Sequence, residues 1–301
     1  MRADSASMQD GAKRRRAANV MAAALWMCGA LASFLLIAVA GREAFKTVST
    51  GTIMLYRSWF ALLVLLLVVV LSGRGFAQFR TQQLGMHGLR SVIHFGAQFG
   101  WFYALSLIPL AQLFAIEFTA PLWTALLAAL TLRERLTAWR IASGVLGFAG
   151  VLVIAQPGHG EVSVGAVFAL LAAMGFAVHY VLTRRLMRGD SAFTVIFYMA
   201  LFQTALASAL LVVDAQIPDT VAMAWILVIA VCGLTAHFSL ARAFSLADAA
   251  IVAPMDFLRL PLIALVGATL YAEPLNPWVL IGGGMVVLAN LINIWSEQRA
   301  A

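Results

Sequence analysis

Residues 104–144 read ALSLIPLAQLFAIEFTAPLWTALLAALTLRERLTAWRIASG, and residues 243–283 read AFSLADAAIVAPMDFLRLPLIALVGATLYAEPLNPWVLIGG. The second stretch begins 139 residues after the first and aligns with it without a gap. The identities at this offset include Ala104/Ala243, Ser106/Ser245, Leu107/Leu246, Ala111/Ala250, Phe118/Phe257, Glu134/Glu273, Leu136/Leu275, Trp139/Trp278 and Gly144/Gly283. An internal repeat at a fixed offset indicates that the fold is built from two copies of one unit.

The composition is that of a membrane protein. Hydrophobic residues make up 63% of the 301 residues and charged residues only 11%, against roughly 25% charged residues in an ordinary soluble domain. The mean hydropathy of +0.94 excludes a soluble globular domain, a disordered chain and a disulfide scaffold. The net charge of +7 does not indicate nucleic-acid binding, because the basic residues lie beside apolar runs, where they set membrane orientation.

Apolar runs predict ten membrane-spanning helices, since about 20 apolar residues cross a bilayer. The expected spans are 18–40, 51–72, 91–107, 110–132, 139–155, 162–182, 193–213, 221–241, 249–271 and 276–295. The run 91–132 is too long for one crossing, and we divide it at Pro109, because proline disfavours helix in the residue before it. The fold class is therefore all-α, with ten transmembrane helices.

The basic residues predict the orientation. With the N-terminus inside, 16 of the 20 Lys and Arg residues fall in inside segments, Arg42 and Lys46 fall outside, and Arg57 and Arg259 fall within spans. This asymmetry predicts a multi-pass protein of the cytoplasmic (inner) membrane with both termini cytoplasmic. The first apolar run is also longer than the core of a signal peptide.

Each copy of the repeat holds five spans, so the second copy must cross the membrane in the opposite sense. The expected organisation is a cytoplasmic segment 1–16, a first five-helix repeat 17–157 and a second five-helix repeat 158–301. Inverted repeats place a binding site at their interface, accessible alternately from each side. Chance similarity between apolar helices is the alternative explanation of the identities.

A family resemblance rests on three stretches of the first repeat. These are Tyr103–Ala111, Glu117–Leu122 and the run from Leu132-Arg133-Glu134-Arg135-Leu136 to the glycine-spaced segment Gly144–Ile154. Together they resemble the EamA-type branch of the drug/metabolite transporter superfamily. The resemblance implies ten spans in two five-span repeats and secondary transport of small organic solutes such as amino acids, nucleotide-like metabolites or vitamins. The second repeat departs from the motif, with Leu258-Arg259-Leu260-Pro261 where the first has Thr119-Ala120-Pro121.

Charged residues inside spans are the strongest site candidates, because an ionisable group at mid-membrane is costly and normally faces a cavity or a partner. They are Arg57, Glu117, Asp256 and Arg259. Glu117 and Asp256 are equivalent in the two repeats, and we expect Arg57 to pair with Glu117. These groups bind a polar or zwitterionic solute, carry a coupling proton or form structural ion pairs. Nearby prolines (Pro121, Pro254, Pro261) predict broken or kinked helices there.

Weaker candidates for substrate binding are polar and aromatic residues in the spans: His94, Gln98, Trp101, His179, Tyr180, Tyr198 and His237. Such side chains can stack on and hydrogen-bond to a heterocyclic solute. Alternatively, each is satisfied by a neighbouring helix. The histidines lack metal-ligand spacing, so we expect no metal. Glu134 and Glu273, at helix junctions, are expected to cap helices or form salt bridges.

The leading hypothesis is a secondary active transporter that moves a small organic metabolite by alternating access. The alternatives are an integral membrane enzyme acting on a lipid or isoprenoid and a passive channel. An enzyme would need an interfacial acid, base or metal cluster, which the sequence does not show, and no phosphate-binding G-x-x-x-x-G-K-[ST] loop occurs. We therefore expect no enzymatic activity and no cofactor. The expected partners are a small-molecule solute and membrane lipid, not nucleic acid. The sequence leaves open whether the protein forms a homodimer.

Overall fold

The computed structural model describes residues 2–73, 75–132, 138–156, 163–209, 216–247 and 249–300. Within them the protein is helical and contains no strand. The first half comprises α1 (Arg2–Ala44), α2 (Thr50–Ser72), the 3-10 helix η1 (Phe76–Phe79), α3 (Leu84–Leu107), α4 (Leu110–Glu117), α5 (Ala120–Leu132) and α6 (Ala138–Ala155). The second half comprises α7 (Val164–Leu186), α8 (Ala192–Ala209), α10 (Thr220–Leu246), α11 (Ala249–Asp256), α12 (Arg259–Tyr271) and α13 (Pro277–Ala300).

These helices make the ten expected crossings, because α4 with α5 and α11 with α12 each form one crossing that is broken in the middle. Among the described residues, eight helical stretches qualify as membrane spans by length and apolar composition alone, and Ile141–Ala155 of α6 is a shorter apolar helix. The remaining crossing is α3, whose 24 residues give about 36 Å of helix at 1.5 Å per residue. It begins at Leu84 rather than near residue 91 as expected, because its polar first turns are buried between neighbouring helices.

The two halves correspond element by element. The bounds of α4 and α11 differ by 139 residues at both ends, as do those of α5 and α12, and α3 and α10 end at equivalent residues. Packing follows the same relation: α1 lies along α10, and the equivalent pair α7 and α3 also lie side by side, while α6 packs on its own counterpart α13. The two five-helix units are therefore inverted repeats that exchange helices across their interface.

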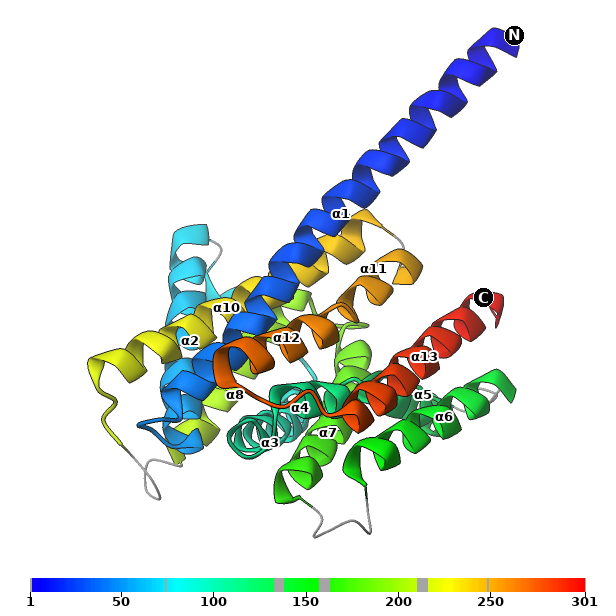
Figure 1. The fold of residues 1–301 in the computed structure, drawn as a ribbon. Helices are drawn as coiled ribbons and strands as arrows, with labels where there is room; N and C mark the ends of the chain where they lie inside the picture. Colours follow the sequence, from blue (N-terminus) through cyan, green and yellow to red (C-terminus); the bar gives the residue numbers. More distant parts are fainter. Residues whose placement is uncertain are drawn as a thin grey trace.

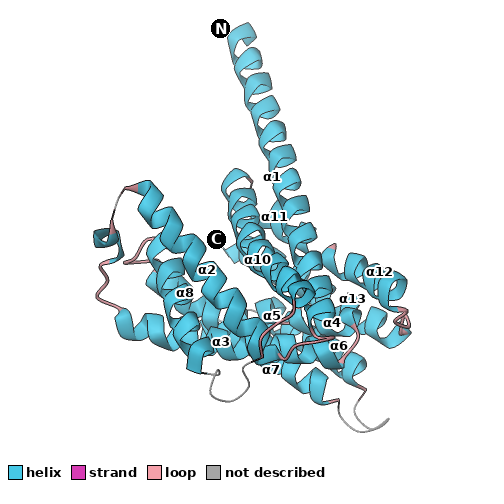
Figure 2. Ribbon diagram, turned by 90° about the vertical axis from the view of Figure 1, so that its left-hand side faces the viewer, coloured by secondary structure: helices cyan, strands magenta, loops and turns pink. Residues whose placement is uncertain are grey.

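One helix reaches beyond the bundle. Figures 1 and 2 show α1 as a continuous rod whose N-terminal part projects away from the other helices. From about residue 19 it packs into the bundle, and Ala23, Met27 and Ala30 are fully or almost fully buried.

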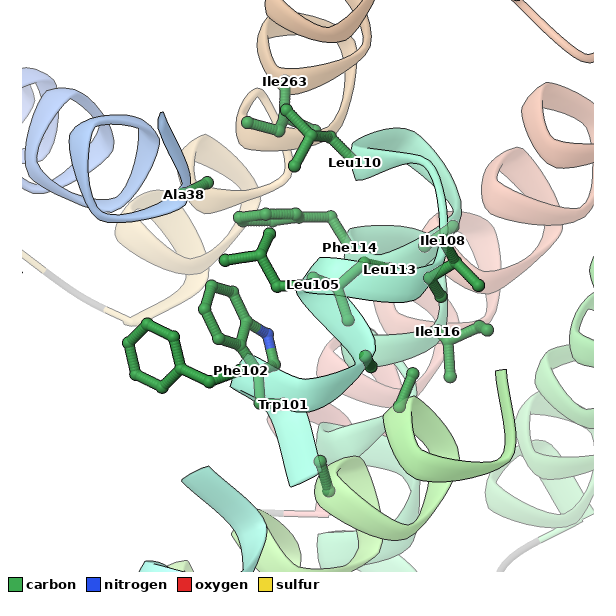
Figure 3. Packing of buried hydrophobic residues seen from close by; sticks show 14 of the residues in the cluster. Ala38, Trp101, Phe102, Leu105, Ile108, Leu110, Leu113, Phe114, Ile116 and Ile263 are labelled. Carbon is green, nitrogen blue, oxygen red and sulfur yellow. The ribbon is translucent and has the colours of Figure 1, made fainter. Parts of the chain in front are cut away.

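The buried core centres on α4. Leu110, Leu113 and Phe114 of this helix are almost inaccessible. Figure 3 shows Leu113 and Phe114 beside Leu105 and Trp101 of α3, and Leu110 beside Ile263 of α12. Between α3 and α4, Ile108 is extended (φ −126°, ψ 159°) and Pro109 caps α4. The run 91–132 is thus divided at Pro109, as expected. The division also places α4 in the middle of the bundle, where both repeats touch it.

The outward surface is apolar. On α2, the side chains of Leu63, Leu67, Val70 and Leu71 are 56–76% exposed. Such a surface would be unfavourable in water and is suited to contact with lipid chains, since bilayer and side chain are equally apolar.

The α6–α13 contact depends on glycine. A Cβ atom on Gly150 would lie 2.7 Å from the carbonyl oxygen of Gly282, and one on Gly282 would lie 2.5 Å from the carbonyl oxygen of Gly150. The two main chains therefore touch without an intervening side chain. Gly96 differs, because a Cβ there would meet nothing within 4 Å.

Candidate functional site

Two helix breaks at equivalent positions form the centre of the candidate site. In the first repeat α4 ends at Glu117 and α5 begins at Ala120, and in the second α11 ends at Asp256 and α12 begins at Arg259. Proline explains both breaks, because Pro121 and Pro261 lie in the first turn after the break and lack the N–H that would continue the helix. Each carboxylate is thus the last residue of its half-helix.

The breaks face each other. Phe118 and Phe257, the residues after the two carboxylates, make an edge-to-face ring contact with centroids 5.4 Å apart. Because these residues are equivalent in the repeat, their contact brings the two breaks together at the interface of the halves. This is the position at which inverted-repeat transporters hold their substrates.

A single arginine bridges the two carboxylates. Arg259 Nη1 lies 3.3 Å from Glu117 Oε1 of the first repeat, and Arg259 Nη2 lies 3.1 Å from Asp256 Oδ2 on its own side. The Arg259 side chain is 7% exposed. An ion pair so buried requires good geometry, because both charges have left water. The bridge links the two halves electrostatically inside the bundle.

Aromatic rings hold the guanidinium of Arg259 in place. Its Cζ lies 4.4 Å from the ring centroid of Phe34, 4.8 Å from that of Phe118 and 5.3 Å from that of Phe114. These are cation–π distances. The three rings come from α1, from the first break and from α4, so the cation of the second repeat is enclosed mainly by the first.

Glu117 has a second partner on α3. The indole N–H of Trp101 donates a hydrogen bond of 2.7 Å to Glu117 Oε2. Both carboxylate oxygens are therefore engaged. Asp256 differs, because its Oδ1 is buried and has no hydrogen-bond partner among the described residues.

The expected pairing of Arg57 with Glu117 is wrong. Arg57 on α2 donates instead to the side-chain oxygen of Gln98 on α3, and its Cζ lies 5.7 Å from the ring centroid of Phe102. The physical reason is that Glu117 already has both oxygens occupied, by Arg259 and Trp101. Gln98 and Trp101 lie three residues apart on α3, so adjacent positions on one helix face hold the two halves of the cluster.

Three further candidates lie around the charges. The side-chain amide Nε2 of Gln203 on α8 donates a hydrogen bond of 2.6 Å to His94 Nδ1, and the His94 ring stacks on that of His179 with centroids 4.0 Å apart. His237 on α10 contacts the Phe34 ring at 6.2 Å and interacts electrostatically with Arg57 and Arg259.

Tyr180 on α7 is exposed over 51% of its surface, and its ring makes an edge-to-face contact with that of His179, with centroids 5.6 Å apart. It therefore offers an accessible hydroxyl beside the histidine pair. We define the central cluster as Arg57, His94, Gln98, Trp101, Glu117, His179, Tyr180, His237, Asp256 and Arg259.

The structure places Tyr198 apart from the central cluster. Its hydroxyl donates to the carbonyl oxygen of Phe79 at 2.9 Å, and its ring lies on that of His87, with centroids 4.8 Å apart. His87 in turn lies 2.9 Å from Asp190. These residues connect η1, the start of α3 and the α7–α8 turn, at one end of the bundle.

At the other end, a second network joins the halves. Glu273, after α12, lies 2.8 Å from Arg42 at the end of α1 and accepts a hydrogen bond of 2.8 Å from the backbone N–H of Leu110. Leu110 is the first residue of α4, so Glu273 both caps this helix and forms a salt bridge, as expected. Its equivalent Glu134 lies outside the described residues. The partner Arg42 was not expected, because repeat symmetry identifies the acid but not the cation that packs beside it.

Comparison with known proteins decides the family. The chain matches the EamA-like transporter family twice, over residues 21–156 and 163–295. It belongs to this EamA family.

Two curated relatives of this chain are named as transporters of small molecules. The S-adenosylmethionine uptake transporter of Rickettsia prowazekii is 28% identical over 246 residues, which cover 81% of this chain and 83% of the relative. The riboflavin transporter of Vibrio cholerae is 29% identical over 285 residues, covering 92% and 94%. A solved crystal structure superposes with a TM-score of 0.63 at 18% identity, over 92% of this chain and 98% of the other, which shows the shared fold. The protein is thus a small-metabolite transporter of the EamA family.

Proposed function

We propose that the protein is a secondary active transporter that carries its metabolite through the central cluster by alternating access. The observation that carries the proposal is the Glu117–Arg259 pair at 3.3 Å. This pair joins the two inverted repeats at their broken helices, where relative movement of the halves would open and close a path. A solute that competes for these charges couples its binding to the movement of the halves.

The proposed membrane is the cytoplasmic membrane, with both termini cytoplasmic, following the distribution of basic residues. In this orientation the Arg42–Glu273 network lies on the external side, and the His87–Asp190 network lies on the cytoplasmic side. The outward apolar side chains contact membrane lipid. The proposed repeat boundaries are 17–157 and 158–301, after the N-terminal segment 1–16. We propose no catalytic role for the cluster, which lacks the interfacial position that chemistry on a lipid would need.

The test is counterflow in proteoliposomes with a panel of labelled metabolites, with and without a pH gradient. We expect saturable flux of at least one compound. Glu117→Gln and Asp256→Asn should each reduce this flux at least tenfold while the protein still inserts and elutes as a folded species. If the parent protein responds to a pH gradient and one of these variants does not, the carboxylate replaced in that variant carries a coupling proton during transport.

The matched control is Asp219→Asn. Asp219 caps α10 by accepting a hydrogen bond of 2.7 Å from the N–H of Ala222, and asparagine caps about equally well. It therefore removes a carboxylate charge without touching the central cluster, and normal flux is expected. Flux that does not saturate would favour a channel, and unchanged flux in both cluster variants would overturn the site.

A further inference from the structure

The central cluster contains two poles of opposite charge. At the first, Glu117 and Asp256 share one cation, Arg259, which leaves one negative charge in excess. At the second, Arg57 is paired with the neutral amide of Gln98, and in the described part of the chain it forms no ion pair with a carboxylate. Each pole therefore holds a charge that the protein does not neutralise.

Unpaired atoms occur at both poles. At the first pole Asp256 Oδ1 and Arg259 Nε, and at the second Arg57 Nε, are buried and lack hydrogen-bond partners among the described residues. Buried polar atoms without partners are rare in native proteins, and leaving them so is costly. The first pole therefore offers a carboxylate acceptor, and the second offers only donors. A molecule with a donor at one end and an acceptor at the other would complement the Asp256 oxygen and Arg57.

The residues that hold Arg57 and Glu117 are neighbours on one helix. Gln98, which holds Arg57, and Trp101, which holds Glu117, are three residues apart on α3. Three residues correspond to a rise of about 4.5 Å along a helix.

Aromatic groups accompany the charges. Phe102 lies beside Arg57, Trp101 beside Glu117, and Phe34 beside Arg259. These flat, apolar faces suit an organic body between two charged ends.

From these observations we infer that the protein selects a zwitterion, whose anionic group binds Arg57 and whose cationic N–H group binds Asp256. This inference rests on the proposed transport function and deepens it by naming the substrate class. It predicts that a solute lacking either charge is transported poorly, and that a neutral heterocycle is not the preferred cargo.

The experiment compares matched solutes in proteoliposome counterflow. The probes are S-adenosylmethionine, which has an ammonium and a carboxylate, its decarboxylated form, and riboflavin, which has neither group. Free amino acids with their amides and N-acetyl derivatives complete the panel. We expect a zwitterion to be transported, and removal of its carboxylate or its ammonium to raise KM about tenfold or more, the size of one lost charge-assisted hydrogen bond.

Two variants assign the poles. In Arg57→Gln, the carboxylate-containing solute and its carboxylate-free analogue should be transported with nearly equal KM, because the variant lacks the guanidinium that distinguishes them. In Asp256→Asn, discrimination against the N-acetyl derivative should be lost in the same way. A structural role for either residue would lower all fluxes together and leave these ratios unchanged.

The control for Arg57 is Arg80→Gln, since Arg80 is exposed next to η1 and should retain the parent ratios. Saturable transport of riboflavin in preference to every zwitterion would overturn the inference while leaving the transport function standing. Parent-like KM ratios in Arg57→Gln would also overturn it. Absence of saturable flux for the whole panel, from folded protein, would count against the transport function itself.

Discussion

The two helix breaks share a backbone plan but differ in their side chains. The break after Glu117 is followed by Phe118, Thr119 and Ala120, and the break after Asp256 by Phe257, Leu258 and Arg259. The first break supplies an acid whose oxygens are both engaged. The second supplies an acid with one free oxygen and also the cation that binds both acids. Repetition thus fixes where the chain opens, while single substitutions decide what each opening binds.

The largest effect should come from Arg259→Ala, which gives the second break the residue that the first break has at this place, Ala120. Glu117 and Asp256 would stay buried without a cation. Removing one partner of a buried ion pair costs about 3–5 kcal/mol, so we expect a much lower melting temperature in detergent and loss of counterflow.

The triple variant Arg259→Ala/Glu117→Gln/Asp256→Asn tests this reason. It carries no uncompensated charge and should recover most of the lost stability but no flux. A single Arg259→Ala variant that melts and transports like the parent protein would show that the bridge is not needed.

Neutralising each carboxylate in turn measures the difference between the breaks. Glu117→Gln disrupts contacts with both Arg259 and Trp101, and hydrogen bonds to charged groups contribute about 1.5–3 kcal/mol each. Asp256→Asn disrupts only its contact with Arg259. We therefore expect Glu117→Gln to lower the free energy of unfolding more than Asp256→Asn, as measured by denaturation in detergent. The reverse order would mean that the second break is the more tightly held.

A smaller difference lies behind the first break. Asn290 of α13 donates a hydrogen bond of 2.7 Å from Nδ2 to the carbonyl oxygen of Phe118, whereas the equivalent residue on α6 is Val151. Asn290→Val makes the repeats alike and leaves this carbonyl without its donor, at a cost of about 1–2 kcal/mol.

Thermal melting of Asn290→Val beside Asn293→Val checks the assignment. Asn293 is also buried on α13, and its Oδ1, like that of Asn290, has no hydrogen-bond partner among the described residues. Unlike Asn290, it donates no hydrogen bond to the carbonyl oxygen of Phe118. Its replacement should be tolerated better. Equal losses in the two variants would attribute the effect to side-chain shape rather than to the hydrogen bond.

The smallest effect concerns the start of α4. Glu273→Gln removes the ion pair with Arg42 but retains an acceptor for the N–H of Leu110. Both side chains are partly exposed, so we expect a loss of about 1 kcal/mol. A double-mutant cycle with Arg42→Gln should give a coupling energy of similar size. Full additivity of the two variants would show that the pair contributes nothing.

Much of the fold could be predicted from the sequence. The ten crossings follow from apolar length, and the broken crossings follow from Pro121 and Pro261 beside intramembrane charges. The gapless 139-residue offset also identifies Glu117 and Asp256 as equivalent. These features depend on local chemistry and on periodicity, which a sequence displays directly.

Side-chain partners were harder to predict, because they depend on how each helix is rotated against its neighbours. Arg57 has Gln98 as its partner rather than Glu117, and Tyr198 faces Phe79 at one end of the bundle. The apolar pattern predicts the start of α3 several residues too late for a related reason. His87 and Arg90 look unsuited to a membrane until Asp190, Thr183 and the carbonyl oxygen of Val195 are seen to satisfy them.

The glycine contact between α6 and α13 has a mechanical consequence. At Gly150 and Gly282 the two main chains touch, so neither helix can approach further and no side-chain rotation can relieve the contact. If the two halves rotate against each other, this crossing lies on the rotation axis. The displacement of each other helix then increases with its distance from the axis. A methyl group at Gly150 or Gly282 would force the two main chains apart. It would change the amplitude of the relative movement of the halves without touching the charged residues of the central cluster.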